Sequence, residues 1–231
     1  MGTVLAALAS VPRRVHLLEQ TLATLRPQVS ALCVYLNGYD AVPDCVRTLA
    51  DEHVLSSSND GAERKFWWAS KHEGLYCSCD DDILYPPDYV ETMRTAVLEQ
   101  GPRVLVTAHG RSYVGKPTTV HSVSGVTGLF FKRVDCGLRV NHGGSGVMAW
   151  DAGALKVPTQ WPLQNIADMQ LAVWAQLHKV PYWLIAHQAH WLKSTALLDP
   201  CGLFALSRTE SHARRNSLLQ QHGRKTGWVL H

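Results

Sequence analysis

The sequence predicts an α/β fold, a single domain built on a central mixed, mainly parallel sheet. Three observations predict it. Short apolar segments alternate with segments of helical periodicity along the first half of the chain. Three adjacent aspartates, Asp80, Asp81 and Asp82, directly follow one of the apolar segments. The chain of 231 residues is 46% hydrophobic and 18% charged, which suits a domain that buries a full core.

The first half supplies the alternating elements. Its expected strands are short apolar runs, and its expected helices carry apolar residues at helical spacing, as Leu18, Leu22 and Leu25 do. The expected strands are residues 4–8, 31–36, 54–55, 75–79 and 104–107. The expected helices are residues 15–25, 44–50, 63–70 and 87–100. This order is typical of a Rossmann-like, nucleotide-binding sheet.

The second half is less regular. Residues 111–150 are rich in Gly, Ser, Thr and Val, and the best strand candidates there are 126–132 and 147–150. A helix over 166–178 and a strand over 182–186 follow. No linker or repeat divides the chain, so we expect one domain over residues 1–231. It would comprise a nucleotide-binding half to about residue 105, a second half over about 106–193 and a C-terminal tail over 194–231.

Charge and cysteine usage narrow the partners and the compartment. The net charge of +3 is too small and too evenly spread to predict nucleic-acid binding. Residues 207–225 are locally basic and would at most allow a peripheral contact with an anionic membrane surface. A solvated helix or a frayed tail is the simpler expectation for this segment. The six cysteines form no CxxC pair, and we expect them to be reduced, buried thiols. No run of about 18 apolar residues occurs, so we expect no transmembrane helix. We therefore expect a cytoplasmic protein.

The aspartate cluster is the strongest chemical signal in the sequence. Asp80, Asp81 and Asp82 end an expected buried strand, and Pro86 and Pro87 then stop it. Adjacent carboxylates repel one another and resist burial, so a positive group should lie among them. Oxygen ligands suit Mg²⁺ or Mn²⁺, ions that usually also hold a substrate's phosphates. Because ligands of open α/β sheets bind at the carboxyl ends of strands, we favour a site over a solvated acidic turn.

Together with the cluster, several short motifs occur in a characteristic order. They are residues 9–13, 36–38, 60–66, 80–82 with 85–89, 143–147, 167–168 and 187–192. In this order they resemble a family 2 glycosyltransferase of the GT-A fold over roughly residues 3–193. The resemblance implies an inverting, metal-dependent sugar transferase whose second half binds the acceptor.

The resemblance also assigns roles to individual residues. The DXD motif of the family implies that Asp80 faces the ribose and Asp82 the metal, with Mn²⁺ or Mg²⁺ as the ion, and it leaves Asp81 open between these two roles. The resemblance also implies a histidine as a further metal ligand, and His190 is preferred over His187 for this role. The remaining residues expected to bind the nucleotide donor are Ser10, Arg13 or its neighbour Arg14, Asn37, Asp60 and Lys65.

The resemblance also implies a general base for the acceptor hydroxyl, located at the start of the helix expected over 166–178. The family places an acidic pair there, and this chain keeps Asp168 but has Ala167 in the first position. A carboxylate in a first helical turn stays ionised at neutral pH and can accept the proton of an acceptor hydroxyl. Gly143 to Gly146 could let the backbone approach a sugar closely, although a structural bulge explains those glycines nearly as well.

Two alternative functions are kept. A sugar nucleotidyltransferase would make the nucleotide sugar, but that class carries a glycine-rich, cationic loop after the first strand, and residues 9–12 contain no glycine. A non-catalytic glycan-binding domain is disfavoured because the aspartates and Asp168 are all present. For the main hypothesis we expect a nucleotide-diphosphate donor, UDP-linked, and a carbohydrate or lipid-linked acceptor in polysaccharide biosynthesis.

Overall fold

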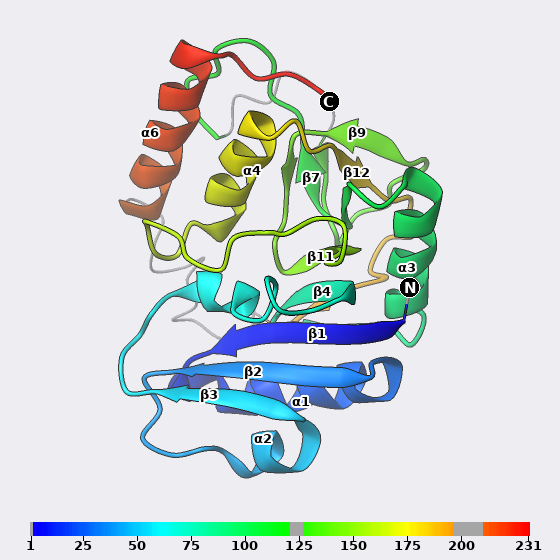
Figure 1. Ribbon diagram of the computed structural model, residues 1–231, viewed down its shortest axis with the longest axis vertical. Coiled ribbons are helices and arrows are strands. Elements are labelled where there is room, and N and C mark those ends of the chain that lie inside the picture. Colours follow the sequence, from blue (N-terminus) through cyan, green and yellow to red (C-terminus); the bar gives the residue numbers. More distant parts are fainter. Residues whose placement is uncertain (1, 121–126, 196–209) are drawn as a thin grey trace.

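The computed structural model describes residues 2–120, 127–195 and 210–231, and a large sheet crosses the molecule (Figure 1). The strands of this sheet are β1 (Thr3–Ser10), β2 (Ala31–Asn37), β3 (Glu52–Ser56), β4 (Gly74–Asp80), β6 (Leu105–Thr107), β9 (Leu138–Val140), β11 (Val147–Asp151) and β12 (Tyr182–Leu184). They lie in the order β3-β2-β1-β4-β11-β6-β12-β9. β11 runs antiparallel between β4 and β6, and β9 is antiparallel to β12, while the other pairs are parallel. The predicted mixed, mainly parallel sheet is therefore confirmed.

Helices cover both faces of this sheet (Figure 1). The helices and helical turns are η1 (Pro12–Arg14), α1 (Val15–Leu25), η2 (Arg26–Gln28), α2 (Asp44–Leu49), η3 (Ala62–Phe66), α3 (Tyr89–Gln100), α4 (Ala167–Leu177) and α6 (Glu210–Lys225). Residues of α1, α2 and α3 pack on one face, and residues of η3 and α4 on the other. Two small sheets complete the fold, formed by β7 (Gly110–Arg111), β8 (Thr127–Gly128) and β10 (His142–Gly143), and by β5 (Ile83–Leu84) and β13 (Lys193–Ser194).

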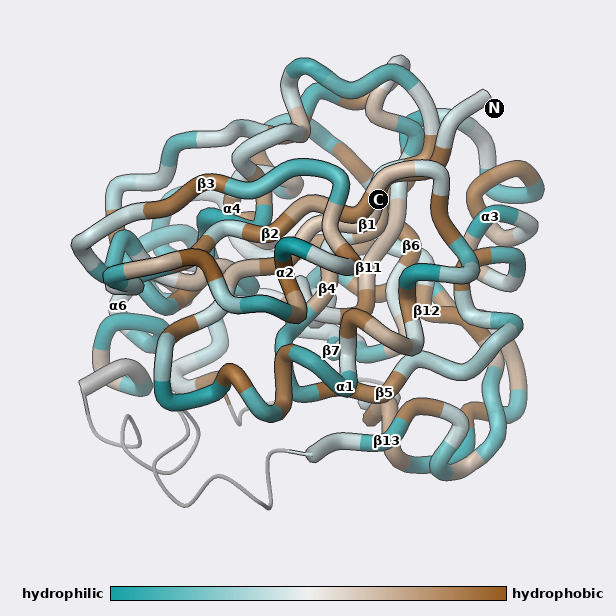
Figure 2. Tube along the Cα trace, turned by 90° about the horizontal axis from the view of Figure 1, so that it is seen from below, coloured by the Kyte–Doolittle hydropathy of each residue, from teal (hydrophilic) through white to brown (hydrophobic). Residues whose placement is uncertain are grey.

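The strand β1 shows why the sheet needs both layers. Successive side chains of a strand point to opposite faces. Val4, Ala6 and Leu8 join the core on one face, whereas Leu5 and Ala7 join the core on the other. A strand buried on both sides reads as a continuous apolar run. Much of β1, β2 and β4 accordingly lies between white and brown in the hydropathy colours of Figure 2.

The segment after β3 differs from its prediction. A helix over 63–70 was expected, but the chain forms the short 3₁₀ helix η3. Residues three apart eclipse one another in a 3₁₀ helix. Glu63 and Phe66 are therefore both buried on one side of η3, and Lys65 is buried beside them. The need to bury two charged side chains with Phe66 explains the tighter turn.

Other boundaries shift less. The helix α3 begins at Tyr89 rather than at Pro87. Within the expected strand over 126–132, Thr127–Gly128 alone is extended among the described residues, and Val126 lies outside them. None of the five described cysteines forms a disulfide; Cys33, Cys77 and Cys79 are buried, Cys136 is exposed, and Cys201 lies outside the described residues.

The C-terminal segment corrects the expectation of a solvated tail. Leu219 of α6 and Trp228 are buried with Tyr113 and Met169, and the indole of Trp228 donates to the carbonyl of Leu219 at 3.1 Å. Residues 210–231 therefore form an additional layer against α4, while Arg208 lies outside the described residues. No helix within the described ranges has the length and apolarity needed to cross a membrane.

Candidate functional site

Polar side chains gather where three parallel strands end. Ser10, Asn37 and Asp80 are the last residues of β1, β2 and β4. In the sheet register, Ser10 lies opposite Leu36, and Ala9 lies opposite Asp80. Parallel strands thus bring these predicted residues to one edge, the usual ligand-binding edge of an open α/β sheet.

Two cations neutralise the aspartate cluster. Arg14, which ends η1, donates to Asp81 at 2.7 Å and also to Asp82. Lys65 of η3, whose side chain is 3% exposed, pairs with Asp80. Burial lowers the pKa of Lys65, but the charge and hydrogen bond of Asp80 outweigh burial, so the net pKa of Lys65 is raised. The predicted positive charge among the aspartates is thus supplied partly by the chain itself.

The middle carboxylate is the most deeply placed. Burial raises the pKa of Asp81 to about 7, against the opposing charge of Arg14. Burial, followed by the neighbouring Asp80, also raises the pKa of Asp82. The Oδ2 atom of Asp81 is buried without a hydrogen-bond partner. A buried polar atom without a partner is costly, and a cation or ligand donor would satisfy it.

Asp80 is held beside the loop that precedes β11. The hydroxyl of Tyr85 accepts from the backbone N–H of Asp80 at 2.9 Å and donates to the carbonyl of Gly146 at 2.5 Å. A Cβ added at Gly146 would lie 1.9 Å from Oδ2 of Asp80. The glycine at position 146 therefore makes room for Asp80 itself.

A second polar group lies at the end of β2. Asp60 accepts hydrogen bonds of 2.7 Å from Tyr35, Ser56 and Ser58, and these bonds lower its pKa. Asn37 accepts from the backbone N–H of Asp60 at 3.0 Å. The chain thus keeps Asp60 ionised and fixed, next to an aromatic surface.

That surface includes a partly exposed indole. The guanidinium of Arg64 lies 5.5 Å from the ring centre of Trp67 and 5.6 Å from that of Tyr35. Trp67 is 36% exposed. A flat ring and a planar cation beside a fixed carboxylate are suited to stack against and hydrogen-bond a nucleobase.

Asp168 lies in the first turn of α4, as predicted. Its Oδ1 accepts from the backbone N–H of Ser145 at 2.9 Å and from the hydroxyl of Ser145 at 2.5 Å. Burial by itself raises the pKa of Asp168, but neighbouring groups outweigh it and lower that pKa to about 2. These groups are, in decreasing order, Arg215, His142, Ser145 and Lys65. Asp168 is therefore an ionised carboxylate at neutral pH, and its lowered pKa makes it a weaker base than a free aspartate.

Buried imidazoles lie close to Asp168. Burial lowers the pKa of His142 to about 3 and that of His109 to about 4, so both rings are neutral at pH 7. His142 stacks on Tyr113 at 5.6 Å between ring centres. Nε2 of His142 and Nδ1 of His109 are buried without hydrogen-bond partners. These atoms are available to a substrate group that would enter beside Asp168.

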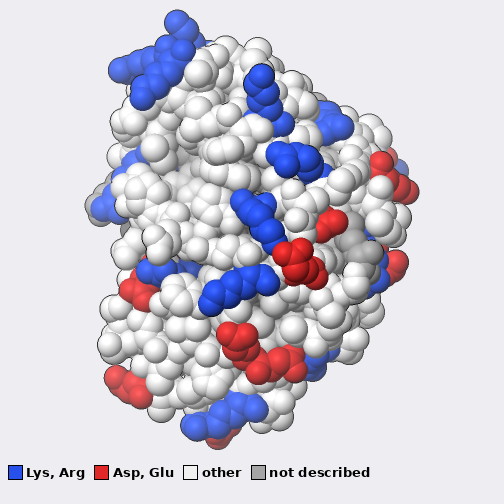
Figure 3. Space-filling model, in the orientation of Figure 1, with Lys and Arg blue, Asp and Glu red and all other residues white. Residues whose placement is uncertain are grey.

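The surface at the end of α6 is basic. Figure 3 shows Lys and Arg side chains there, whereas both signs are mixed over β1, β2 and β3. Arg214, Arg224 and Lys225 are exposed on α6. Clustered positive charge attracts anionic partners over a distance of about a Debye length.

Other predicted residues are placed less centrally. Arg13 is exposed, and its neighbour Arg14 is the one that contacts the aspartates. His190 is exposed with φ of 58°, and its backbone N–H donates to Phe131 at 3.2 Å. His187 is buried, with Nε2 3.0 Å from the carbonyl of Ala108. Within the described part of the chain, no three His, Cys, Asp or Glu side chains form a ready-made metal-binding group.

Sequence reasoning missed two contributors. Ser145 binds Asp168, and Glu63 accepts hydrogen bonds from the backbone just before α4. Both residues stand inside motifs that the sequence singles out, 143–147 and 60–66. No local periodicity indicates their partners, because the contacts join distant segments.

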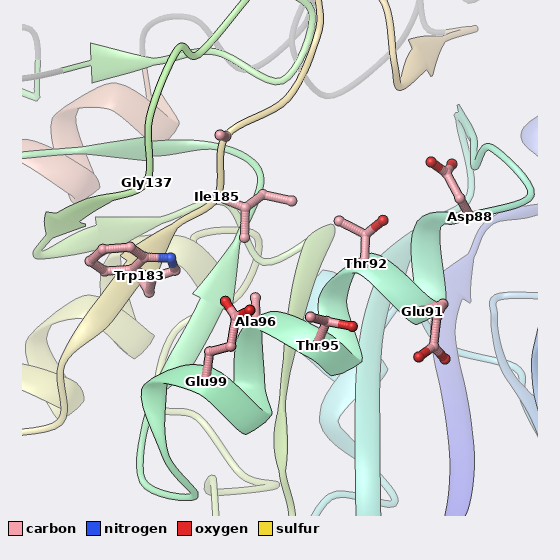
Figure 4. Close-up of a pocket in the computed structure, with 10 residues that line it drawn as sticks. Asp88, Glu91, Thr92, Thr95, Ala96, Glu99, Gly137, Trp183 and Ile185 are labelled. Carbon is pink, nitrogen blue, oxygen red and sulfur yellow. The ribbon is translucent and has the colours of Figure 1, made fainter.

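A pocket of about 460 Å³ lies elsewhere, along α3 (Figure 4). Trp183 and Ile185 form one wall, and Thr92, Thr95 and Glu99 lie along the helix opposite. None of the predicted site residues lines it. The chemistry of the aspartates and Asp168 therefore points to the edge of the sheet and not to this pocket.

Comparisons with known proteins give little beyond the fold. No protein-family model matches the chain, and no curated protein does either. A solved nucleotidyl transferase from Methanothermobacter thermautotroptrophicus is similar with 12% identity and a TM-score of 0.47, over 98% of this chain and 100% of that one. A 4-diphosphocytidyl-2C-methyl-D-erythritol synthase is similar with 10% identity and a TM-score of 0.47, over 80% of this chain and 88% of that one. At these values neither likeness bears on activity, and the family 2 glycosyltransferase resemblance remains a prediction.

Proposed function

We propose that this protein transfers a sugar from a nucleotide-diphosphate donor, UDP-linked, to a hydroxyl of a carbohydrate or lipid-linked acceptor. One observation carries the proposal. Lys65 pairs with Asp80 of the aspartate cluster and also interacts electrostatically with Asp168. Ser145 also binds Asp168, and the next residue, Gly146, lies against Asp80. A candidate donor site and a candidate proton acceptor therefore lie close together, as a displacement at the anomeric carbon requires.

The donor half would bind the nucleotide through groups at the strand ends. Asp60 and Asn37, beside Trp67, would recognise the base, and Ser10 and Asp80 would contact the ribose. Arg14 and Lys65 carry the charges that would face the diphosphate, since guanidinium and ammonium groups bind phosphate oxygens well.

The chemistry of the aspartate cluster suits a hard divalent cation, although no three acidic or imidazole side chains among the described residues are arranged as a ready-made metal site. The partnerless Oδ2 of Asp81 and the carboxylate oxygens of Asp82 and Asp80 would supply oxygen ligands. Bound there, Mn²⁺ or Mg²⁺ would supply Lewis-acid stabilisation of the leaving diphosphate. Arg14 and Lys65 occupy some of these oxygens, so they would exchange carboxylate for phosphate partners when donor binds. His190 stays a proposed additional ligand.

Asp168 would act on the acceptor. The acceptor hydroxyl loses its proton to Asp168 as its oxygen bonds to the anomeric carbon, and the bond from that carbon to the diphosphate oxygen breaks. Ser145 fixes the Oδ1 atom of Asp168, which leaves Oδ2 for the proton. Inversion follows because attack and departure take place on opposite faces of the sugar.

Nucleotidyl transfer is the second candidate. Arg14, which follows β1 and contacts Asp81 and Asp82, is a cation in the region where that class uses its phosphate loop. The absence of glycine from residues 9–12 favours sugar transfer.

A binding panel tests the proposal. We expect a nucleotide-diphosphate sugar with Mn²⁺ to raise the melting temperature, and the same sugar nucleotide in chelator to raise it much less. Asp82→Asn should remove the metal-dependent part, whereas Asp44→Asn, an exposed carboxylate on α2, should keep it. Stabilisation by a nucleoside triphosphate with a sugar 1-phosphate, and none by any nucleotide sugar, would favour nucleotidyl transfer instead.

A further inference from the structure

Glu63 connects the two halves of the candidate site. Its side chain is buried at 4% exposure on η3. Oε2 accepts from the backbone N–H of Asn165 at 2.9 Å, and Oε1 accepts from that of Ile166 at 2.8 Å. The side chain of Gln170 also donates to Oε1 at 3.3 Å. One carboxylate thus takes up backbone donors at the start of α4, where negative charge is stabilised by the helix dipole.

The contact is made from both sides. The side chain of Asn165 accepts from the backbone N–H of Ala62 at 3.2 Å, so η3 and the α4 start hold each other reciprocally. Asn165 has φ of 61°, and Gly61 has φ of 93°. A Cβ at Gly61 would lie 2.6 Å from Oε2 of Glu63. Gly61 adopts a positive φ without strain, whereas the left-handed backbone of Asn165 costs free energy and is held by the surrounding contacts.

The same short helix carries Lys65. Lys65 follows Glu63 by two residues on η3, and its side chain pairs with Asp80. On α4, Asp168 follows the N-cap residue Ile166 by two residues. The hydroxyl of Tyr76, on β4, donates to the carbonyl of Lys65 at 2.6 Å. Any shift of η3 relative to α4 therefore changes the separation between Asp80 and Asp168.

We propose that Glu63 is a positioning residue that fixes Asp168 relative to the Lys65–Asp80 pair by holding the N-terminus of α4. The inference rests on the proposed function for its catalytic consequence. It predicts that losing the contact impairs transfer and spares donor affinity, because η3 stays anchored to β4 through Lys65 and Tyr76. Misplacement of about 1 Å can cost roughly 100-fold in rate.

Glu63→Gln tests this proposal. An amide has one acceptor oxygen where the carboxylate has two, so it cannot bind the N–H groups of both Asn165 and Ile166 in the observed manner. We expect kcat to fall roughly 10- to 100-fold, with the Kd for the donor nucleotide changed less than about threefold. We expect the effect of Glu63→Gln to shrink in an Asp168→Asn background, because a positioning residue acts through the group it positions.

The matched control lies at the other end of α4. Gln176 donates to the carbonyl of Val229 at 2.9 Å and accepts from its N–H at 3.1 Å. Gln176→Ala removes these two bonds and should lower the free energy of unfolding without changing kcat. Equal falls of kcat in Glu63→Gln and Gln176→Ala would overturn the positioning role and indicate a general loss of stability.

A second readout does not depend on activity. The carbon NMR chemical shift of the Asp168 carboxyl, which reports its surroundings, should change in Glu63→Gln and stay in Gln176→Ala. An unchanged Asp168 chemical shift with unchanged kcat would overturn the inference. A wild-type protein that transfers no sugar, with the Asp168 chemical shift still changed by Glu63→Gln, would instead contradict the proposed function alone.

Discussion

The substitution Asp168→Asn tests two roles of the Asp168 charge, its contribution to the stability of the fold and its role as the proton acceptor. The amide keeps an oxygen that can accept from the N–H and hydroxyl of Ser145, so the local geometry should persist. What is lost is the negative charge, whose pKa is lowered from 3.8 to about 2 in the fold. By linkage, that difference corresponds to roughly 2 kcal/mol of stability at neutral pH.

The sign of the pH dependence follows from the direction of the shift. A carboxyl with a folded pKa below its unfolded pKa contributes its full stability above about pH 4, and loses it as the pH falls through about 2. We expect urea unfolding at pH 7 to show Asp168→Asn less stable by roughly 1–3 kcal/mol. Between pH 4 and 2 the wild-type protein should lose stability more steeply than the variant.

The same variant should bind donor nucleotide normally and transfer sugar roughly 10²- to 10⁴-fold more slowly, the usual loss for a general base. Equal stability at pH 7, together with parallel pH profiles, would refute the electrostatic reasoning. Transfer at a rate near that of the wild-type protein would show that the proton acceptor lies elsewhere.

Three further substitutions address the donor half. Asp82→Ala should abolish metal-dependent donor binding and leave the apo fold intact, since removing one of several like charges relieves repulsion; a large loss of apo stability in urea would mean that the cluster is structural. Gly146→Ala should displace Asp80, because the added Cβ would lie 1.9 Å from its Oδ2, so donor affinity in calorimetry should fall; wild-type affinity would contradict the observed packing. Lys65→Met should weaken binding of the nucleoside diphosphate more than that of the nucleoside, and equal losses would place Lys65 away from the phosphates.

The large sheet was predictable because its strands are long enough to show a pattern. The runs that became β1, β2 and β4 are apolar over most of their length, and burial on both faces produces that signal. The strands β7, β8 and β10 contain two residues each and depend on tertiary pairing, so no periodicity indicates them. The burial of α6 depends on Leu219 and on Trp228 beyond the helix, within a strongly polar segment.

The residues of the candidate site were likewise predictable only in part from the sequence. Asp80, Asp81 and Asp82 stand out in the sequence as three adjacent carboxylates after an apolar run, and Asp168 stands out by its place in the ordered set of motifs. Their partners could not be read from the sequence. The Ser145–Asp168 contact spans 23 residues and the Glu63–Ile166 contact spans 103. Such contacts are set by how the sheet and α4 pack, and no local spacing encodes them.

One measurement tests the central claim most directly. The protein would be incubated with Mn²⁺ and a nucleotide-diphosphate sugar plus a hydroxyl acceptor, or with a nucleoside triphosphate plus a sugar 1-phosphate, and the products followed by ³¹P NMR. Glycosyl transfer predicts release of nucleoside diphosphate from the first mixture, dependent on acceptor and on Asp168, and no pyrophosphate from the second. Pyrophosphate release from the second mixture, with the nucleotide sugar of the first left intact, would contradict the account.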